Sequence, residues 1–221
     1  MPPIDRLIEV HSGLFNELIR ELREAKALSN ICLVTINHEG FSLKIIGICC
    51  SPRKGNTEWL MRKLIEMTKK RGVETELIML KDRNIEVCDG CLVCEKTNAC
   101  HIKDDMQGIY NKMLSTDAVV LGSPDYMDAP TSSALNFIHR MYPLYGKIKG
   151  KRFASVIVGQ VTGADGVASR GKVEDYFKSI GSLFGLDYRG SISVAARDPN
   201  DASRITDIEK QCEDLATKIL K

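Results

Sequence analysis

The chain has 221 residues, of which 43% are apolar and 27% are charged, and its formal net charge is +2. A chain of this length can bury one full core, and its nearly balanced charge argues against nucleic acid as a partner. No apolar run approaches the roughly 18 residues of a membrane span, so we expect no membrane partner. The first residues, MPPIDRLIEVHSG, lack the basic flank and apolar stretch of a signal peptide. We therefore expect a cytoplasmic protein whose thiols stay reduced.

The first forty residues differ in pattern from the rest of the chain and are predicted to form a helical extension, 1–40. Apolar residues recur there at near-helical spacing between Ile4 and Leu22, although Gly13 can interrupt the helix. Residues 31–36 can add a short strand. The pattern predicts a helix that packs on the core or on a second subunit, and we assign it no further role.

From residue 41 to residue 221, short and continuously apolar runs alternate with amphipathic stretches, as in buried parallel strands joined by helices. Five strands are predicted, at 43–50, 73–80, 117–124, 153–160 and 186–196. Helices are predicted between and after them, at 56–72, 104–117, 131–145, 173–185 and 201–221. The alternation predicts an α/β fold, namely a flavodoxin-like, doubly wound, five-stranded parallel sheet with strand order 2-1-3-4-5.

Ligands of such sheets bind beyond the carboxyl ends of the strands, so the loops at those ends carry the candidate binding residues. The loop after the first strand, SPRKGNT (51–57), offers the hydroxyls of Ser51 and Thr57, the charges of Arg53 and the lysine beside it, and a helix N-terminus. Asn56 or Thr57 can cap that helix. The loop suits a phosphate monoester, and an ordinary capped turn is the alternative. It has neither a Walker P-loop pattern nor G-x-G-x-x-G.

Two further loops end at the same predicted edge. SPDYMDAP (123–130) follows the third strand, and its tyrosine and methionine can lie against a flat ring or merely cap the strand. GQVTGADGVASRG (159–171) follows the fourth strand, and its four glycines either let the backbone approach a ligand closely or make a flexible loop. The convergence of three such loops on one edge favours a ligand site there.

Four of the chain's eight cysteines fall within CDGCLVCEKTNAC, residues 88–100, with the spacing C-x2-C-x2-C-x5-C. Cysteine thiolates hold iron–sulfur clusters, and a compact run of this kind can wrap one cluster. Zinc usually uses two well-separated C-x2-C hooks and fits less well, while a metal-free loop and a disulfide switch stay open. The surrounding segment, 81–103, is long for a compact domain, which favours a functional loop held together by its ligand. Cys49, Cys50 and Cys212 are expected to pack as small hydrophobes.

Three segments together, SPRKGNTEWL, CDGCLVCEKTNACHIKDDM and GSPDYMDAPTSSALNFIHR, resemble the iron–sulfur flavoprotein family of archaea and anaerobes, within the NADPH-dependent FMN reductase, flavodoxin-like group. The resemblance covers residues 43 to 215 and implies one FMN and one 4Fe-4S cluster per subunit. The resemblance assigns the cluster to Cys88, Cys91, Cys94 and Cys100. It assigns the FMN phosphate to Ser51, Arg53, Asn56 and Thr57, and the isoalloxazine ring to Pro124, Asp125, Tyr126 and Met127. A third FMN contact is assigned to Thr162 and Gly163. Relatives usually have a lysine and then aspartate–arginine where this chain has Asn136 and His139–Arg140. We expect that departure to alter an interface or a salt bridge without abolishing flavin binding.

The resemblance implies an FMN-dependent oxidoreductase that transfers electrons between a ferredoxin-like one-electron carrier and an acceptor through the cluster and FMN. Such an activity requires no acid or base from the protein, and the family's members are homodimers or homotetramers. Two alternatives stay open. One is an NAD(P)H-dependent FMN or quinone reductase without a working cluster, and the other is a zinc-stabilised binding module that is not an enzyme.

Overall fold

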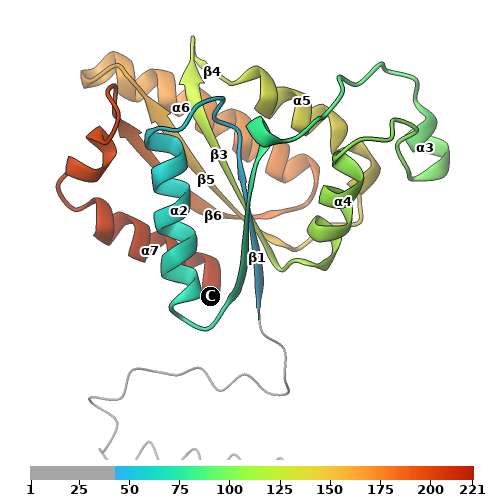
Figure 1. Ribbon diagram of the computed structural model, residues 1–221, viewed down its shortest axis with the longest axis horizontal. Coiled ribbons are helices and arrows are strands. Elements are labelled where there is room, and N and C mark those ends of the chain that lie inside the picture. Colours follow the sequence, from blue (N-terminus) through green and yellow to red (C-terminus); the bar gives the residue numbers. More distant parts are fainter. Residues whose placement is uncertain (1–42) are drawn as a thin grey trace, which may run out of the picture. The chain divides into compact units, whose positions relative to one another are not determined.

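The computed structural model describes residues 43–221, so the predicted extension 1–40 and the strand predicted at 31–36 lie outside the described residues. Within this part of the chain the five parallel strands are β1 (Lys44–Cys49), β2 (Glu74–Met79), β3 (Ala118–Tyr126), β5 (Arg152–Gly159) and β6 (Asp187–Ala195). They lie in the order β2-β1-β3-β5-β6 (Figure 1). A two-residue strand, β4 (Ala129–Pro130), pairs antiparallel with the end of β3. With the parallel strands counted along the chain, the order is 2-1-3-4-5, and the predicted flavodoxin-like fold is confirmed.

The central strands are apolar along most of their length because helices cover both faces of the sheet. β1 is buried from Ile45 to Cys49, and β3 is buried over its first seven residues. Helix α2 (Asn56–Lys69) crosses this part of the sheet closely. A Cβ atom on Gly122 of β3 would lie 2.6 Å from the side chain of Met61 in that helix. A side chain at this point of β3 would therefore force Met61 to move, and the glycine lets α2 pack directly on the sheet.

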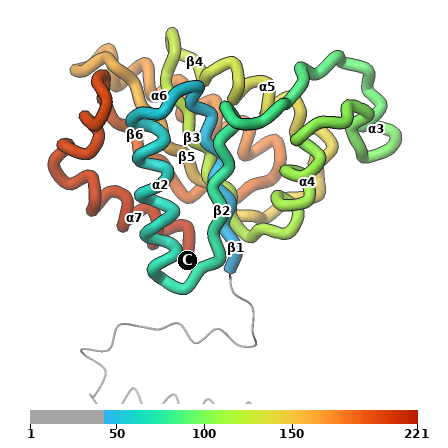
Figure 2. Tube along the Cα trace, in the orientation of Figure 1, coloured from blue at the N-terminus to red at the C-terminus, as the bar shows by residue number. Residues whose placement is uncertain are grey.

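Two helical layers enclose the sheet (Figure 2). One layer consists of α2 and α7 (Ile208–Leu220), and the other of α4 (Met106–Ser115), α5 (Ser132–Arg140) and α6 (Gly163–Leu183). This double winding brings the carboxyl ends of β1, β3 and β5 to a single edge. None of the helices described between residues 43 and 221 has the length and apolar composition needed to cross a membrane.

Several elements begin or end elsewhere than the sequence pattern predicts. Helix α6 begins at Gly163, whose φ of +70° turns the chain, so most of the glycine-containing stretch 159–171 is helical rather than a loop. The predicted last helix, 201–221, is divided into a 3-10 turn, η3 (Asp201–Arg204), and α7. Two more 3-10 turns are η1 (Leu80–Asp82) and η2 (Tyr142–Leu144). The predicted segment 81–103, called the cysteine segment from here on, begins in η1 and contains one short helix, α3 (Val93–Thr97). The rest of it is irregular, as predicted.

Candidate functional site

A cavity of about 210 Å³ opens at the edge of the sheet where β1, β3 and β5 end. It is lined by Ser51, Arg53, Gly55, Asn56, Thr57, Pro124, Asp125, Tyr126, Met127, Val158, Gly159, Gln160 and Ala196. Eight of the ten residues expected to contact FMN are among them. The other two, Thr162 and Gly163, lie at the start of α6, outside the lining. The predicted convergence of the strand-end loops thus places most of the expected residues around one cavity.

The first turn of α2 lies at this cavity, and no side chain of the described residues caps it. Gly55 occupies the N-cap position. The prediction that Asn56 or Thr57 caps the helix is wrong, because Asn56 is engaged elsewhere: its Nδ2 donates to the Asp198 carbonyl at 2.9 Å, and its Oδ1 accepts from the Ala202 amide at 3.2 Å. Uncapped amides at the positive end of the helix dipole suit an anion such as a phosphate.

A tight hairpin between β3 and β4 forms another wall of the cavity. Tyr126 pairs with Ala129, so Met127 and Asp128 make a two-residue turn, with φ of +57° and +64°. Left-handed backbone at a residue other than glycine costs on the order of 1–3 kcal/mol. An ion pair of 2.6 Å between Asp128 and Lys172 ties the turn to α6. Met127 is 97% exposed and Tyr126 is 44% exposed, so the hairpin presents an apolar surface that suits a flat ring.

Asp125 carries an unsatisfied oxygen in the same wall. Its Oδ2 accepts a hydrogen bond from the Ser169 hydroxyl at 2.6 Å, whereas its Oδ1 is buried and has no partner among the described residues. A buried acceptor without a donor is costly, so this oxygen needs a donor that the described residues do not supply. The uncapped helix and the apolar hairpin match the phosphate and the ring of a flavin mononucleotide.

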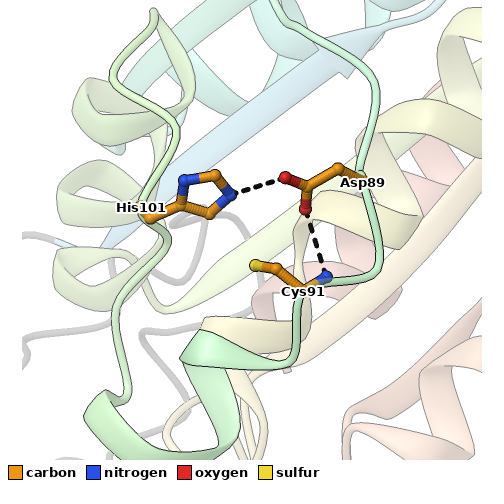
Figure 3. A group of neighbouring side chains, drawn as sticks. All are labelled: Asp89, Cys91 and His101. Atoms are coloured by element: carbon orange, nitrogen blue, oxygen red, sulfur yellow. Dashed lines mark hydrogen bonds and ion pairs between the residues drawn. The ribbon is translucent and has the colours of Figure 1, made fainter.

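A second hollow, of about 120 Å³, lies in the cysteine segment. Its lining includes all four predicted ligands, Cys88, Cys91, Cys94 and Cys100, together with Asp89, His101, His139 and Tyr142. Asp89 connects two sides of the hollow: it accepts from the Cys91 amide at 3.2 Å and pairs with His101 Nε2 at 2.8 Å (Figure 3). The fold therefore brings the four cysteines to one place, although only Cys94 lies in a helix, α3, and the other three lie in irregular chain.

The other three cysteines of the hollow lie close enough to Cys94 to affect the ionisation of its thiol. Burial raises the pKa of the Cys94 thiol, and the negative forms of Cys100, Cys91 and Cys88 raise it further. A cationic group between the sulfurs relieves this repulsion, and four soft sulfur donors suit an iron–sulfur cluster or zinc. The donor set fits the 4Fe-4S cluster that the family resemblance implies.

The outer part of the cysteine segment is held by polar contacts more than by packing. Leu92 and Asn98 flank α3 with left-handed backbone, at φ of +59° and +55°. Tyr142 of η2 donates to the Glu95 carboxylate at 3.0 Å, and Lys147 Nζ donates to the Asn98 carbonyl at 2.9 Å. A segment held in this way gains much of its order from a bound group when its thiols ligate one.

Comparison with known proteins agrees with this geometry. The family model for NADPH-dependent FMN reductase matches residues 43–184. The chain belongs to this family. Several curated relatives are named iron–sulfur flavoprotein. One from Methanocaldococcus jannaschii is 38% identical over 103 residues, which are 46% of this chain and 53% of the relative. One from Archaeoglobus fulgidus is 41% identical over 98 residues, which are 44% of this chain and 48% of the relative.

The chain spans about half the length of the curated relatives it matches. Among solved structures, a WrbA-like flavodoxin from Agrobacterium tumefaciens superposes with a TM-score of 0.54 at 14% identity, over 81% of this chain and 96% of that chain. At that identity the likeness shows the fold alone. Family and fold are therefore established for this chain.

Sequence reasoning missed several residues at both hollows of this FMN reductase family member. Gln160 and Ala196 line the first cavity and directly follow β5 and β6, so the rule on the carboxyl ends of strands predicts such positions. His139 and Tyr142 line the cysteine hollow from α5 and η2, and no local pattern near the cysteines indicates them. Among the described residues, three cysteines lie outside the cysteine segment, namely Cys49, Cys50 and Cys212. All three are buried, as predicted.

Proposed function

We propose that this chain is an FMN-dependent oxidoreductase that passes electrons between a ferredoxin-like one-electron carrier and an acceptor, using FMN and a 4Fe-4S cluster. The observation that carries the proposal is the presence of two distinct hollows in one chain, one at an uncapped helix N-terminus and an apolar hairpin, the other lined by four cysteines. Membership of the FMN reductase family supports the flavin. The names of the curated relatives support the cluster.

In this proposal the first cavity holds FMN, which supplies one-electron and two-electron redox chemistry when bound. The phosphate is held by the first-turn amides of α2 and by Ser51, Arg53, Asn56 and Thr57, of which Asn56 contributes its backbone. The ring is held by Pro124, Asp125, Tyr126 and Met127. Gly159 and Gln160 provide the third contact, and Thr162 and Gly163 lie just beyond them.

The second hollow holds the cluster through the thiolates of Cys88, Cys91, Cys94 and Cys100, and the cluster supplies one-electron transfer when bound. Asp89 orients the Cys91 amide and is itself held by His101, so the two residues fix the loop on the ligand side. The chain's own residues bind, orient and shield the two groups, and no side chain needs to move a proton.

The same proposal includes a homodimer or homotetramer in the cytoplasm, where thiolates stay reduced. The support is a group of exposed apolar side chains beside the cysteine hollow. Val87 is 73% exposed, Leu92 58% and Tyr145 53%, and exposed apolar side chains that gather in one region are typical of a surface that a second subunit covers.

The test is anaerobic stopped-flow reduction of the fully loaded protein by a reduced ferredoxin. We expect the cluster and flavin absorbances to bleach in turn, and we expect a Cys94→Ser variant to keep FMN but to lose its reduction by ferredoxin. Dithionite, which needs no docking partner, reduces the flavin of both proteins. Equal reduction of the variant and the wild type by ferredoxin would contradict a route through the cysteine site.

A second function is favoured by one specific observation, the match to the NADPH-dependent FMN reductase family. An NAD(P)H-dependent FMN or quinone reductase needs the first cavity only. It predicts rapid flavin reduction by NADPH in the Cys94→Ser variant, at the rate of the wild type. Flavin reduction in the Cys94→Ser variant, measured once with reduced ferredoxin and once with NADPH, therefore distinguishes the two functions.

A further inference from the structure

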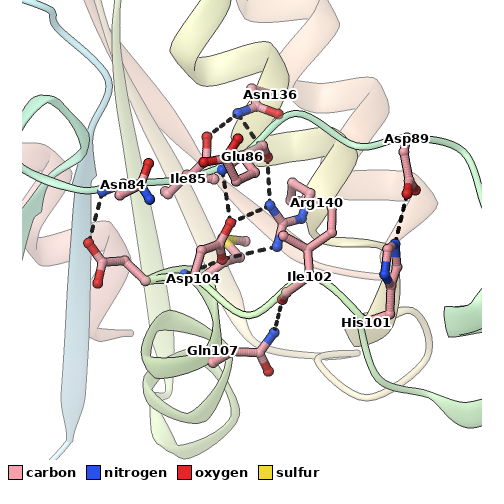
Figure 4. A network of polar contacts seen from close by, with 12 residues as sticks. Asn84, Ile85, Glu86, Asp89, His101, Ile102, Asp104, Gln107, Asn136 and Arg140 are labelled. Atoms are coloured by element: carbon pink, nitrogen blue, oxygen red, sulfur yellow. Dashed lines mark hydrogen bonds and ion pairs between the residues drawn. The ribbon is translucent and has the colours of Figure 1, made fainter.

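Both ends of the cysteine segment meet at one buried ion pair (Figure 4). The Arg140 guanidinium, at the end of α5, binds both carboxylate oxygens of Asp104: Nη1 lies 2.7 Å from Oδ2, and Nη2 lies 3.0 Å from Oδ1. Each side chain is only 1% exposed. The two parallel hydrogen bonds between an arginine and a carboxylate give the ion pair a defined geometry as well as additional energy.

The same two side chains also hold the backbone on each side of the segment. Arg140 Nη1 donates to the Glu86 carbonyl at 2.6 Å, and Asp104 Oδ2 accepts from the Glu86 amide at 2.8 Å. Asp105 adds a second connection, because its Oδ2 accepts from the Asn84 amide at 2.8 Å and its amide donates to the Asn84 carbonyl at 3.1 Å. The chain is therefore fastened two residues before Cys88 and four residues after Cys100.

Helix α5 holds this junction at a second point. Asn136, one turn before Arg140, donates through Nδ2 to the Ile85 carbonyl at 3.0 Å. Tyr110 of α4 donates to the Arg140 carbonyl at 2.5 Å and belongs to the core cluster against which Cys100 packs.

We propose that Asp104 and Arg140 are positioning residues for the cysteine site, which hold the segment in place before any metal group binds and set opposite charges beside the bound group. The inference rests on the proposed function only for the identity of that group. Residues 84–104 are mostly exposed, so little packing opposes their disorder. Because the ion pair fastens both ends of the loop, it reduces the entropy cost of closing the loop around a ligand. The Arg140 guanidinium and the Cys100 sulfur lie close enough to interact electrostatically through protein rather than through water.

The first experiment is hydrogen exchange on the full, iron-free chain. Arg140→Gln is expected to speed exchange of the amides of Asn84, Glu86 and Asp105 at least tenfold while amides in the sheet keep their protection. Lys151→Met is the matched control, because it removes a partly buried cation that donates to the Leu114 and Thr116 carbonyls at the opposite edge of the sheet. Exchange in Arg140→Gln that equals the control would overturn the positioning role.

The second experiment measures the reduction potential of the cluster in the loaded protein. Arg140→Gln leaves Asp104 unpaired and is expected to lower the potential, whereas Asp104→Asn leaves the cation unpaired and is expected to raise it. Arg140→Lys keeps the charge and loses the two-bond geometry, so its loop exchange rises while its potential stays near that of the wild type. Shifts of one sign in both charge-removing variants would overturn the tuning role.

The two experiments also separate the inference from the proposed function. A wild-type chain that binds no iron contradicts the proposed function, and the exchange experiment still decides whether the pair positions the loop. If a variant fails to assemble the cluster, the same exchange measurement still tests whether the pair positions the loop. A wild type that binds iron normally, with variants that match Lys151→Met in exchange and in potential, contradicts the inference alone.

Discussion

The two candidate sites differ in how much regular structure surrounds them. The first cavity is built from strand ends and a helix N-terminus, and residues such as Thr57, Pro124 and Gly159 around it are buried. The cysteine hollow is built mostly from irregular chain, in which Cys88 and Cys91 are exposed. An ion pair and a few hydrogen bonds hold this chain in place. The first site is formed by folding of the sheet, whereas the second depends on polar fastening and on its own ligand.

This difference has a physical consequence for how each site fails. Removing a contact at the first cavity leaves the sheet intact and weakens only the binding of a ligand. Removing a thiol or the fastening pair from the cysteine segment changes the order of the segment itself. The variants below separate these two kinds of failure, beginning with the largest expected effect.

The largest effect is expected from Cys94→Ser, which removes one of four sulfur ligands. Iron and acid-labile sulfide should fall below about a tenth of the wild-type content, because metal binding and order of the segment are coupled. FMN content should not change. Cys212→Ala on α7 is the control, since Cys212 is buried away from the segment, and it should retain iron. Loss of FMN together with iron would show that the two sites do not form independently.

The Asp104→Asn variant tests the fastening pair through stability and its pH dependence. Breaking a buried pair costs about 3–5 kcal/mol of unfolding free energy, measured by urea unfolding of the iron-free chain at neutral pH. Burial raises the pKa of Asp104, but hydrogen bonds from Arg140, Glu86 and Met106 outweigh it and hold the pKa below its ordinary value of 3.8.

The sign of the pH effect follows from that depressed pKa. The contribution of Asp104 to stability is full above about pH 4 and is lost as the pH falls through the depressed pKa of the folded state. The decrease in unfolding free energy as the pH falls below about 4 should therefore be smaller in Asp104→Asn than in the wild type. Glu76→Gln breaks an exposed pair with Lys112 and should cost no more than about 1 kcal/mol. Equal costs for the two variants would contradict a special role for the buried pair.

Thr57→Val tests the first cavity without touching its fold. Loss of the hydroxyl that we propose binds the FMN phosphate should weaken FMN affinity by about 10-fold to 100-fold, measured by fluorescence titration of the flavin-free chain. Thr68→Val in the same helix removes a buried hydroxyl that donates only to the Ile65 carbonyl, and it should leave the affinity unchanged. Iron content should stay constant in both variants. An unchanged affinity in Thr57→Val would place the phosphate elsewhere.

The smallest effect is expected at the hairpin turn. Met127→Asn should raise the unfolding free energy of the flavin-free chain by about 1 kcal/mol, because asparagine tolerates left-handed backbone better and the exposed side chain gives up no packing. Leu183→Asn makes a comparable change at an exposed position of right-handed helix and should give no gain. FMN affinity should fall in Met127→Asn alone. A stabilised hairpin with full affinity would show that the strained turn does not serve the ring.

The sheet and the first cavity were predictable because their signals are local. Continuous apolar runs identify buried strands such as β1, and the topology rule places the loops after β1 and β3 together. The start of α6 was not predictable, because its glycines are typical of a loop. Gly166 shows why glycine is needed inside the helix, since a Cβ atom there would lie 1.9 Å from the Val161 carbonyl oxygen.

The fastening of the cysteine segment was not predictable from the sequence, for a different reason. The four cysteines are close in the chain, and their spacing alone indicates a ligand. Asp104 and Arg140 are 36 residues apart, and neither the spacing nor the residue types around them indicate that they pair. Asn56 was misassigned as a helix cap because its partners, Asp198 and Ala202, lie more than a hundred residues away. Long-range polar contacts of this kind appear only once the fold is known.

The most direct test of the account is the composition of anaerobically purified protein, measured as iron, acid-labile sulfide and FMN with a visible spectrum of the same sample. The account predicts about four iron, four sulfide and one FMN per chain. FMN without iron or sulfide would contradict the two-site electron carrier and leave an NAD(P)H-dependent flavin reductase in its place.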